Sequence, residues 1–493
     1  PWPPSTYAAH PYIGGAKARG MPMFDRSVRE AIMPFVALAV LTAVAAAPAQ
    51  AQFLSPRFQR LGAVSVAVEA DAGRQAVALA DLDGDARPDL VAIDPDNARI
   101  GIYRNDGGGG FALVAEPEIG LTPMAVAIAD VASPFASDAQ GAPDGLPDII
   151  VGGDAGEVRI LLGRGDGQVD PAEQDLDDFL ETFEVIGLAV GDFDENGALD
   201  LALLDAFGVY LVCNEAGTFA PCGAVDGLDV DADDPIEILA GDFDADADLD
   251  LAVLDRAAQR VSPLLGRGDA SFAIGSPVSV SGEAVGAETV DLAVARLDGD
   301  ATDDLVAINH TDDLQFIAVS LLGRANGSFR VTRFVVDFQA SALAVDDFDP
   351  DEENGVDVLV GYEDFGVTVN LGDSAGSFLD PFYPVGSNGV GSVSLLVAVD
   401  LDGDARPDIV SINRAGTQAT VLLNASTPPC VGDCDANGVV TVDELVTGVN
   451  IAIGGFDPRQ CLALQVDGSI NVAISELIAA VRASLEGCQA PPA

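Results

Sequence analysis

The most constraining feature of this sequence is a pattern that recurs about every 50 residues, the usual length of a four-stranded β-propeller blade. Each copy has an apolar strand, an acidic loop and a second apolar strand. The four clearest copies are VALADLDGDARPDLVAID from Val77, LAVGDFDENGALDLALLD from Leu188, ILAGDFDADADLDLAVLD from Ile238 and VAVDLDGDARPDIVSIN from Val397. Weaker copies begin near Ala125, Val290 and Leu343. The pattern predicts an all-β fold, a β-propeller of seven blades.

A third strand follows each copy, then a Gly-rich turn, often a Phe, and a fourth strand. These Phe residues are Phe111, Phe219, Phe272, Phe329 and Phe378. The seventh copy ends after its third strand, ATVLLNAS, whereas FQRLGAVSVAV from Phe58 stands alone before the first copy and resembles a fourth strand. Pairing the two would close the ring and remove two exposed sheet edges. The alternative is that the segment from Phe58 is a disordered spacer.

The acidic loops have the spacing of a calcium site. In DLDGDARPD, side-chain oxygens at positions one, three, five and nine alternate with the carbonyl oxygen of position seven. Calcium accepts about six to eight oxygen ligands in flexible geometry, so one loop can wrap one ion. Four loops keep the set, and the candidate ligands are Asp81, Asp83, Asp85, Arg87 and Asp89; Asp192, Asp194, Asn196, Ala198 and Asp200; Asp242, Asp244, Asp246, Asp248 and Asp250; Asp400, Asp402, Asp404, Arg406 and Asp408.

From Phe58 to Ala425 these loops and Gly-x-Phe turns resemble the FG-GAP or VCBS repeats of the integrin α-subunit propeller. The resemblance implies calcium between the first two strands of a blade, with a structural role that stiffens each hairpin. Three loops depart from the pattern. Asp130 to Asp148 and Asp347 to Asp357 carry insertions, and whether they bind calcium stays open. Arg296 replaces the first Asp of the fifth loop, where its guanidinium can substitute for the ion's charge, so we expect no calcium there.

The carboxyl-terminal tail carries a second kind of calcium motif, DCDANGVVTVDE, which matches the EF-hand loop. Its candidate ligands are Asp433, Asp435, Asn437, Val439 through its carbonyl, Thr441 and Glu444. Apolar residues at helical spacing follow from Glu444 and again from Glu476. The tail resembles a dockerin-type module, which implies a cohesin-like partner. A second loop lacks acidic residues at Ala463 and Ile474, so a stapled cap or docking knob is the alternative.

The amino terminus has the pattern of an export signal. Arg26 and Arg29 precede an apolar run from Ala31 to Ala47, and cleavage is expected after Ala51.

Six cysteines fit an oxidising compartment. Cys213 and Cys222 flank a turn and are placed to staple a hairpin, whereas the pairing of Cys430, Cys434, Cys461 and Cys488 stays open. The predicted organisation is upstream residues and signal in 1–51, propeller in 52–425, linker in 426–429 and the EF-hand domain in 430–493.

The charge of the chain limits its partners. Lys and Arg total 23 against 79 Asp and Glu, a formal net charge of −56 that repels nucleic acid and anionic membranes. No membrane span is expected once the signal is removed.

Catalysis finds little support in the sequence, so we do not expect an enzyme. After the signal only His310 remains as a histidine, and the chain has no HExxH or phosphate-binding Gly-Lys motif. The RGD tripeptides at Arg164 and Arg267 fall in the Gly-rich third turn of a repeat, which favours a turn over integrin mimicry.

The sequence therefore predicts a secreted calcium-binding propeller that acts as an extracellular binding or adhesion scaffold for a protein or glycan ligand. Two alternatives remain. One is a structural or assembly component recruited through its dockerin-like tail, and the other is an accessory part of a polysaccharide-degrading system.

Overall fold

The structure is a computed structural model of the whole chain, which divides into two units, Pro1–Gln52 and Phe53–Ala493. All described residues belong to the second unit. They are residues 58–65, 75–107, 110–131, 144–176, 184–215, 217–222, 228–230, 232–281, 288–310, 316–336, 340–348, 355–362, 366–378, 383–385, 392–413, 418–424, 440, 442–452, 477–478, 480–482 and 484. The predicted export signal lies outside these residues.

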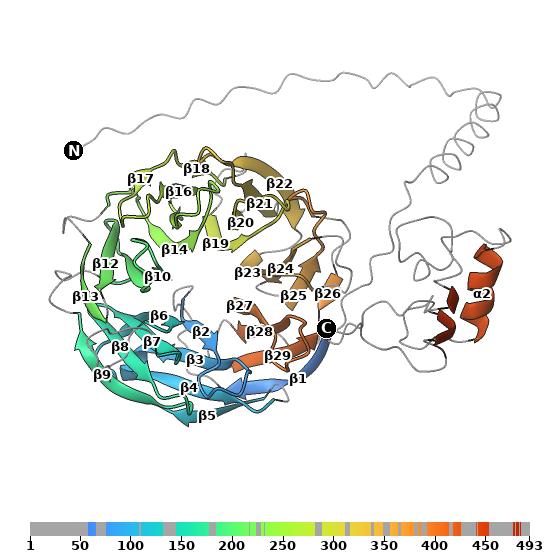
Figure 1. Cartoon of the computed structure of the whole chain (residues 1–493), viewed down its shortest axis with the longest axis horizontal. Helices are drawn as coiled ribbons and strands as arrows, with labels where there is room; N and C mark the ends of the chain where they lie inside the picture. The colour runs from blue at the N-terminus through green and yellow to red at the C-terminus, as the bar shows by residue number, and fades with distance from the viewer. Residues whose placement is uncertain are drawn as a thin grey trace, which may run out of the picture. The chain divides into compact units, whose positions relative to one another are not determined.

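Seven antiparallel sheets form a ring, and the first strand of each lies nearest its centre (Figure 1). Blade 1 contains β2 (Val77–Ala80), β3 (Asp89–Asp94), the short 3-10 helix η1 (Pro95–Asn97), β4 (Arg99–Asn105) and β5 (Phe111–Ala115). Blade 2 contains β6 (Pro123–Ala129), β7 (Asp148–Gly153), β8 (Val158–Gly163) and β9 (Val169–Asp175). Blade 3 contains β10 (Gly187–Gly191), β11 (Asp200–Leu204), β12 (Val209–Glu215) and β13 (Thr218–Pro221).

The remaining blades repeat this order along the chain. Blade 4 contains β14 (Pro235–Gly241), β15 (Asp250–Asp255), β16 (Arg260–Leu265), β17 (Ala273–Ile274) and β18 (Val278–Ser279), which also pairs with β16. Blade 5 contains β19 (Glu288–Ala295), β20 (Asp304–His310), β21 (Phe316–Leu322) and β22 (Arg330–Val336). Blade 6 contains β23 (Ala340–Asp346), β24 (Asp357–Tyr362), β25 (Gly366–Asn370) and β26 (Tyr383–Val385). Blade 7 contains β27 (Val393–Val399), β28 (Asp408–Asn413) and β29 (Gln418–Asn424).

The amino-terminal strand closes the ring, as predicted. Strand β1 (Phe58–Ser65) pairs antiparallel with β29, from Phe58 opposite Asn424 to Ser65 opposite Gln418. Blade 7 is therefore completed by a strand from the other end of the propeller sequence. The alternative of a disordered spacer is wrong for residues 58–65.

The core lies between neighbouring blades. The second strands are apolar runs buried on both faces, such as Leu251 and Val253 of β15, which pack with Ala202 of blade 3. Burial on both faces explains why these strands read as continuous hydrophobic runs instead of alternating patterns. The seven interfaces make the ring one continuous structure.

The Phe residues found in the sequence pack across these interfaces. Phe193, between the first two acidic ligands of blade 3, lies 5.9 Å from Phe272 of blade 4 between ring centroids. Phe243 of blade 4 lies 5.8 Å from Phe329 of blade 5 in the same way. Phe348 of blade 6 lies 6.0 Å from Phe58, so Phe58 occupies the position of a fourth-strand Phe.

The predicted hairpin staple is present, since Cys213 of β12 and Cys222, just after β13, form a disulfide.

In the tail, α2 (Val442–Ala452) is helical as expected, and so are the described residues 477–478, 480–482 and 484. Glu444 lies in α2, whereas Asp433, Asp435, Asn437, Val439 and Thr441, the second tail loop and the tail cysteines lie outside the described residues. Among the described helical segments, none has the length and apolar character to span a membrane.

We predict that Phe58→Ala weakens closure of the ring and lowers the free energy of unfolding by about 2 kcal/mol, because a half-buried ring contact is lost. Urea unfolding followed by circular dichroism measures this value. Leu113→Ala in β5 is the control, since Leu113 is 49% exposed and its loss should change stability by less than about 0.5 kcal/mol. Equal effects of the two variants would contradict a special role for Phe58.

Candidate metal centres

The carboxylate at position one organises the start of the loop in blades 1 and 7. In blade 1, Asp81 accepts hydrogen bonds from the backbone N–H groups of Gly84 (2.8 Å) and Asp85 (3.1 Å) on one oxygen and of Ala86 (2.7 Å) on the other. Gly84 and Ala86 have φ angles of 76° and 65°, in the left-handed region. The carboxylate thus supports a turn that is unfavourable for Ala. Asp400 of blade 7 makes the same three bonds.

The aspartate at position nine has a role that the sequence did not reveal. In blade 1 its two oxygens accept separate backbone hydrogen bonds, from the N–H of Leu82 at position two (3.2 Å) and from the N–H of Asn105 at the end of the third strand (2.8 Å). All seven blades repeat this arrangement, through Asp89, Asp148, Asp200, Asp250, Asp304, Asp357 and Asp408. Position nine therefore locks the loop to the blade, whatever the loop binds.

Burial makes these position-nine carboxylates reluctant to ionise. Burial raises the pKa of Asp250 to about 7, and the pKa values of Asp200, Asp304 and Asp408 to about 6. The two backbone N–H groups lower each value, whereas neighbouring loop aspartates raise it further. A cation in the loop would favour the charged form and oppose these shifts.

The side chains at positions one, three and five come together in three loops. In blades 1, 4 and 7, one oxygen from each of the three side chains lies within 4.8 Å of the others: Asp81, Asp83 and Asp85; Asp242, Asp244 and Asp246; Asp400, Asp402 and Asp404. Calcium binds oxygen at about 2.3 to 2.6 Å, so two ligands of one ion are at most about 5 Å apart. The spacing of the carboxylates fits a single ion in each loop.

Several oxygens in these loops are buried and have no hydrogen-bond partner in the part of the chain that the structure describes. They are the Oδ1 atoms of Asp83, Asp192, Asp242, Asp244 and Asp402. A buried acceptor without a donor is costly, and a hard cation would satisfy it. This chemistry of the donors fits calcium.

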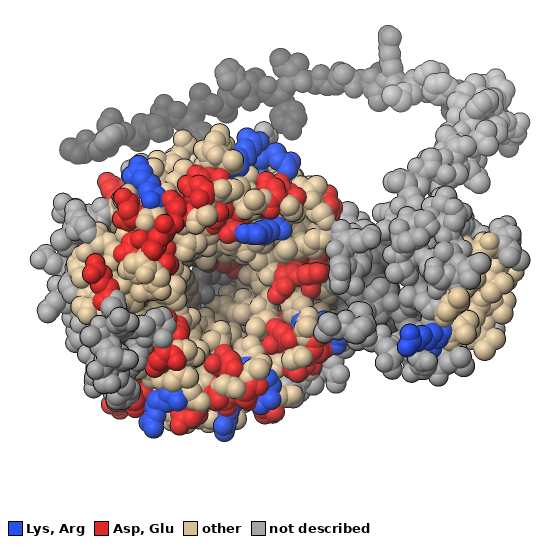
Figure 2. All heavy atoms as spheres, viewed as in Figure 1, with Lys and Arg blue, Asp and Glu red and all other residues tan. Residues whose placement is uncertain are grey.

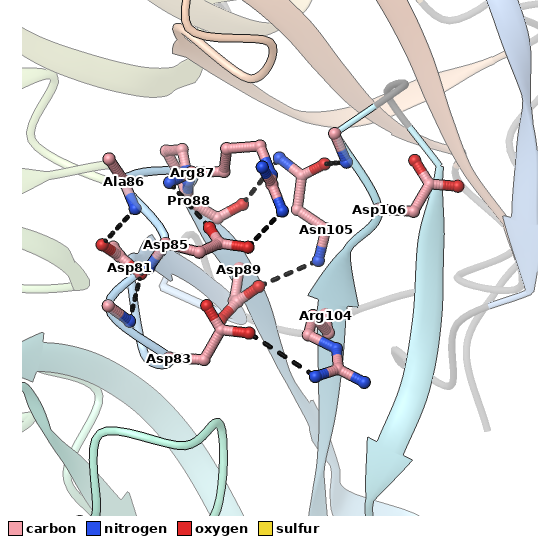
Figure 3. A network of polar contacts seen from close by, with 12 residues as sticks. Asp81, Asp83, Asp85, Ala86, Arg87, Pro88, Asp89, Arg104, Asn105 and Asp106 are labelled. Carbon is pink, nitrogen blue, oxygen red and sulfur yellow. Dashed lines mark hydrogen bonds and ion pairs between the residues drawn. The ribbon is translucent and has the colours of Figure 1, made fainter.

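Figure 3 shows the blade 1 loop, in which Asp83 and Asp85 lie near Asp81 and Asp89. Two arginines approach the cluster. Arg87, whose carbonyl was predicted as a ligand, pairs its guanidinium with Asp85, and Arg104 lies 3.6 Å from Asp83. In blade 7, Arg406 pairs with Asp404 in the same manner as Arg87 with Asp85.

Blade 3 differs from the other predicted sites. Here Asp194 and Asp200 lie within 4.8 Å of the Cys213 sulfur, which belongs to the disulfide and is no free ligand. Asn196 turns its amide toward Asp194 (3.1 Å), and Ala198 at position seven donates its N–H to Asn196 (2.7 Å). At the same position in blade 4, the N–H of Asp248 bonds to Asp246 (3.0 Å).

Two of the three altered loops carry insertions after position one. Asp130 of blade 2 accepts bonds from Asp144 (3.1 Å) and Gly145 (2.7 Å), beyond its insertion. Asp347 of blade 6 donates its N–H to Asp346 (2.9 Å), and most of the insertion that follows lies outside the described residues.

In blade 5, Arg296 pairs with Asp303 through Nε (2.9 Å), so its guanidinium supplies a positive charge at this loop. The oxygens of Asp298, Asp300 and Asp304 nevertheless lie within 4.8 Å of one another. The expectation that this loop binds no calcium therefore stays a prediction.

The two RGD tripeptides and His310 lie at repeat positions that the sequence predicted. Arg164 to Asp166 and Arg267 to Asp269 form the turns between the third and fourth strands of blades 2 and 4. Gly165 and Gly268 have φ angles of 68° and 64°, so each RGD glycine has a conformational role. His310 is the last residue of β20, and its side chain is outside the described part.

Figure 2 shows patches of Asp and Glu around the hollow centre of the propeller face, with fewer Lys and Arg between them. This distribution agrees with the strongly negative charge of the chain.

The comparisons with known proteins agree with this fold. A family model described as FG-GAP-like repeat matches residues 59–132 and 143–203. No curated protein matches the sequence. Among solved structures, BBS1N in complex with ARL6DN, soaked with lead, is 14% identical, covers 75% of this chain and 98% of its own, and has a TM-score of 0.50.

Two further structures are weaker matches. A protein from Lactobacillus plantarum is 14% identical over 63% of this chain and 85% of its own, with a TM-score of 0.44. The periplasmic gluconolactonase PpgL of Pseudomonas aeruginosa is 14% identical over 67% of this chain and 97% of its own, with a TM-score of 0.42. At 14% identity, the similarity to BBS1N extends to the fold alone.

The arrangement of the blades makes this protein a seven-bladed β-propeller. Residues 59–132 and 143–203 match FG-GAP-like repeats, which supports an FG-GAP-repeat β-propeller.

We predict that Asp250→Ala lowers the free energy of unfolding by about 3 kcal/mol in calcium-free buffer, because two buried N–H groups lose their acceptor. Urea unfolding measures the change. Asp246→Ala is the matched control, since Asp246 is exposed and accepts one exposed hydrogen bond, from the N–H of Asp248, so its loss should change the stability of the ion-free protein by less than about 0.5 kcal/mol. If both variants were equally stable, position nine would not be the lock of the blade.

Proposed function

We propose that this protein is a secreted calcium-binding propeller that serves as an extracellular scaffold for binding or adhesion, with a protein or glycan as its ligand. The observation that carries the calcium part is the set of buried Oδ1 atoms of Asp83, Asp192, Asp242, Asp244 and Asp402 that have no donor among the described residues. Each belongs to a loop that the sequence predicts as a calcium site.

The residues that would hold the ions are those at positions one, three, five and seven of blades 1, 3, 4 and 7. Position nine would contribute if its carboxylate accepted the ion beside its two N–H donors, which the several lone pairs of a carboxylate allow. A bound calcium ion would neutralise the loop and relieve carboxylate repulsion. Its role would be structural, holding the loop face in one conformation for a ligand.

Binding explains the loop carboxylates better than catalysis does. The position-nine carboxylates hold backbone groups and the others converge in metal-like clusters, so they are not free as an acid and base pair. The Cys213–Cys222 disulfide supports an oxidising environment outside the cytosol. A fold shared with varied proteins does not select the ligand.

We predict that millimolar calcium raises the melting temperature of the chain by about 10 °C or more over the value in excess EGTA, since ligands that bind only the native state stabilise it. A differential scanning calorimetry melt of the full chain measures the shift. The combination of Asp83→Asn, Asp194→Asn, Asp244→Asn and Asp402→Asn should abolish most of the shift and leave the EGTA melt nearly unchanged. A wild-type melt insensitive to calcium would refute the metal assignment.

A second candidate is recruitment through the tail to a cohesin-like partner. Val442, Val446 and Val449 of α2 are 71%, 53% and 48% exposed and lie on one helical face. An exposed apolar face on a helix is a feature of docking surfaces.

An array of extracellular proteins and glycans, probed in calcium, separates the two candidates. We predict that the full chain and a chain lacking residues 430–493 bind the same spots, because the propeller loops provide the ligand surface. Retained binding of both in EGTA would argue against calcium-dependent loops. Loss of all binding with the tail would favour recruitment through the tail.

A further inference from the structure

The loops of neighbouring blades are joined by hydrogen bonds. The residue at position two of a loop bonds its N–H to the position-nine aspartate of its own blade, and its carbonyl accepts a bond from the next blade. In blade 7, Leu401 donates to Asp408 (2.8 Å), and its carbonyl accepts from Nδ2 of Asn105 in blade 1 (2.8 Å). Position two therefore lies between two blades.

Asn105 contacts two candidate metal loops at once. Its backbone N–H bonds to Asp89 of its own blade (2.8 Å), while its side chain reaches Leu401, which lies between ligands Asp400 and Asp402 of blade 7. Its Oδ1 also accepts the N–H of Gly107 (2.9 Å). Asn105 is 1% exposed and is held from three directions (Figure 3).

The same link recurs around the ring with different donors. Asn214 of blade 3 donates to the Val131 carbonyl of blade 2 (2.6 Å), and Asn424 of blade 7 donates to the Phe348 carbonyl of blade 6 (3.0 Å). In blades 2 and 4 the third strand is followed by Gly or ends in Gly instead of Asn. There a backbone N–H of the turn between the third and fourth strands donates to the position-two carbonyl of the neighbouring blade. Gly167 of blade 2 donates to Leu82 (3.1 Å), and Ala270 of blade 4 donates to Phe193 (2.7 Å).

The last two junctions use charged residues. Asp303 of blade 5 bonds to blade 4 in both directions, donating to the Asp242 carbonyl (2.7 Å) and accepting the Asp242 N–H (2.9 Å). Arg330 of blade 5 lies 3.6 Å from Asp298 and donates to the Ala375 carbonyl of blade 6 (3.3 Å). Each of the seven junctions thus has a polar contact on the loop side.

We propose that Asn105 is a positioning residue that couples the loops of blades 7 and 1, so that these two loops bind calcium cooperatively. The inference rests on the calcium binding proposed above. An ion in blade 1 orders Asp89 and, through Asn105, the Leu401 peptide between two ligands of blade 7. The second ion then meets a loop that is already ordered and binds more tightly.

The experiment measures calcium binding by the loops of blades 7 and 1 within the full chain. A parent chain carries Asp194→Asn, Asp244→Asn and Asp435→Asn, which disable blades 3 and 4 and the tail motif. Isothermal titration with calcium is then compared for the parent, for Asn105→Ala and for Asn214→Ala. Asn214→Ala is the matched control, because it breaks the same kind of link at the junction of blades 2 and 3, which contains neither loop of the pair. A further variant adds Asp83→Asn and Asp402→Asn to the parent, which disables the loops of blades 1 and 7. Any calcium that this variant binds is bound outside the four predicted propeller loops.

We expect the parent to bind two ions with a Hill coefficient of about 1.5, out of a maximum of about 2 for two sites. Asn105→Ala should still bind two ions, with a Hill coefficient of about 1, and Asn214→Ala should match the parent. Two ions with a Hill coefficient of about 1 in the parent would overturn the coupling and leave calcium binding intact. No bound ion in the wild-type chain would instead overturn the proposed function.

A second measurement covers the case in which Asn105→Ala fails to fold, which circular dichroism would reveal. Asp402→Asn in the parent removes the blade 7 ligand and leaves Asn105 in place. Coupling predicts that the calcium concentration for half-saturation of blade 1 then rises about threefold, the shift that corresponds to a Hill coefficient of about 1.5. An unchanged midpoint would overturn the inference.

Discussion

The interaction on which this structure depends is the pair of hydrogen bonds that each position-nine aspartate accepts. One bond holds the acidic loop and the other holds the end of the third strand, so a single buried side chain joins three parts of a blade. A buried carboxylate is unfavourable without partners, and the two N–H groups provide them. The raised pKa of Asp250, to about 7, shows how strongly burial opposes its charge even so.

Ring closure builds on these blades. Because the interfaces between blades hold the apolar core, an open ring would expose a core face as well as sheet edges. Strand β1 completes blade 7, and Phe58 packs on Phe348 in the way that other fourth-strand Phe residues pack on the preceding blade. The candidate metal loops lie on this framework, which fixes both ends of each loop.

The blades and their closure were predictable from local pattern. Each strand pair and its loop are contiguous in sequence, and the unpaired segment at Phe58 matched the missing strand of blade 7. Convergence of Asp81, Asp83 and Asp85 also followed from their spacing within one turn. The two bonds of Asp89 were not predictable, because its partner Asn105 follows the aspartate at a distance that differs between blades, as Gly323 does for Asp304.

The sequence by itself determined the repeat, the number of blades, the closing strand and the aspartates that gather in the loops of blades 1, 4 and 7, because hydrophobic period and short-range spacing act within about 50 residues. Only the tertiary structure decided which oxygens are occupied by backbone donors and which lack one. It also placed Asn105 beside Leu401, 296 residues away in sequence. Contacts between blades depend on how rigid sheets meet around the ring, and no local pattern in the chain specifies that geometry.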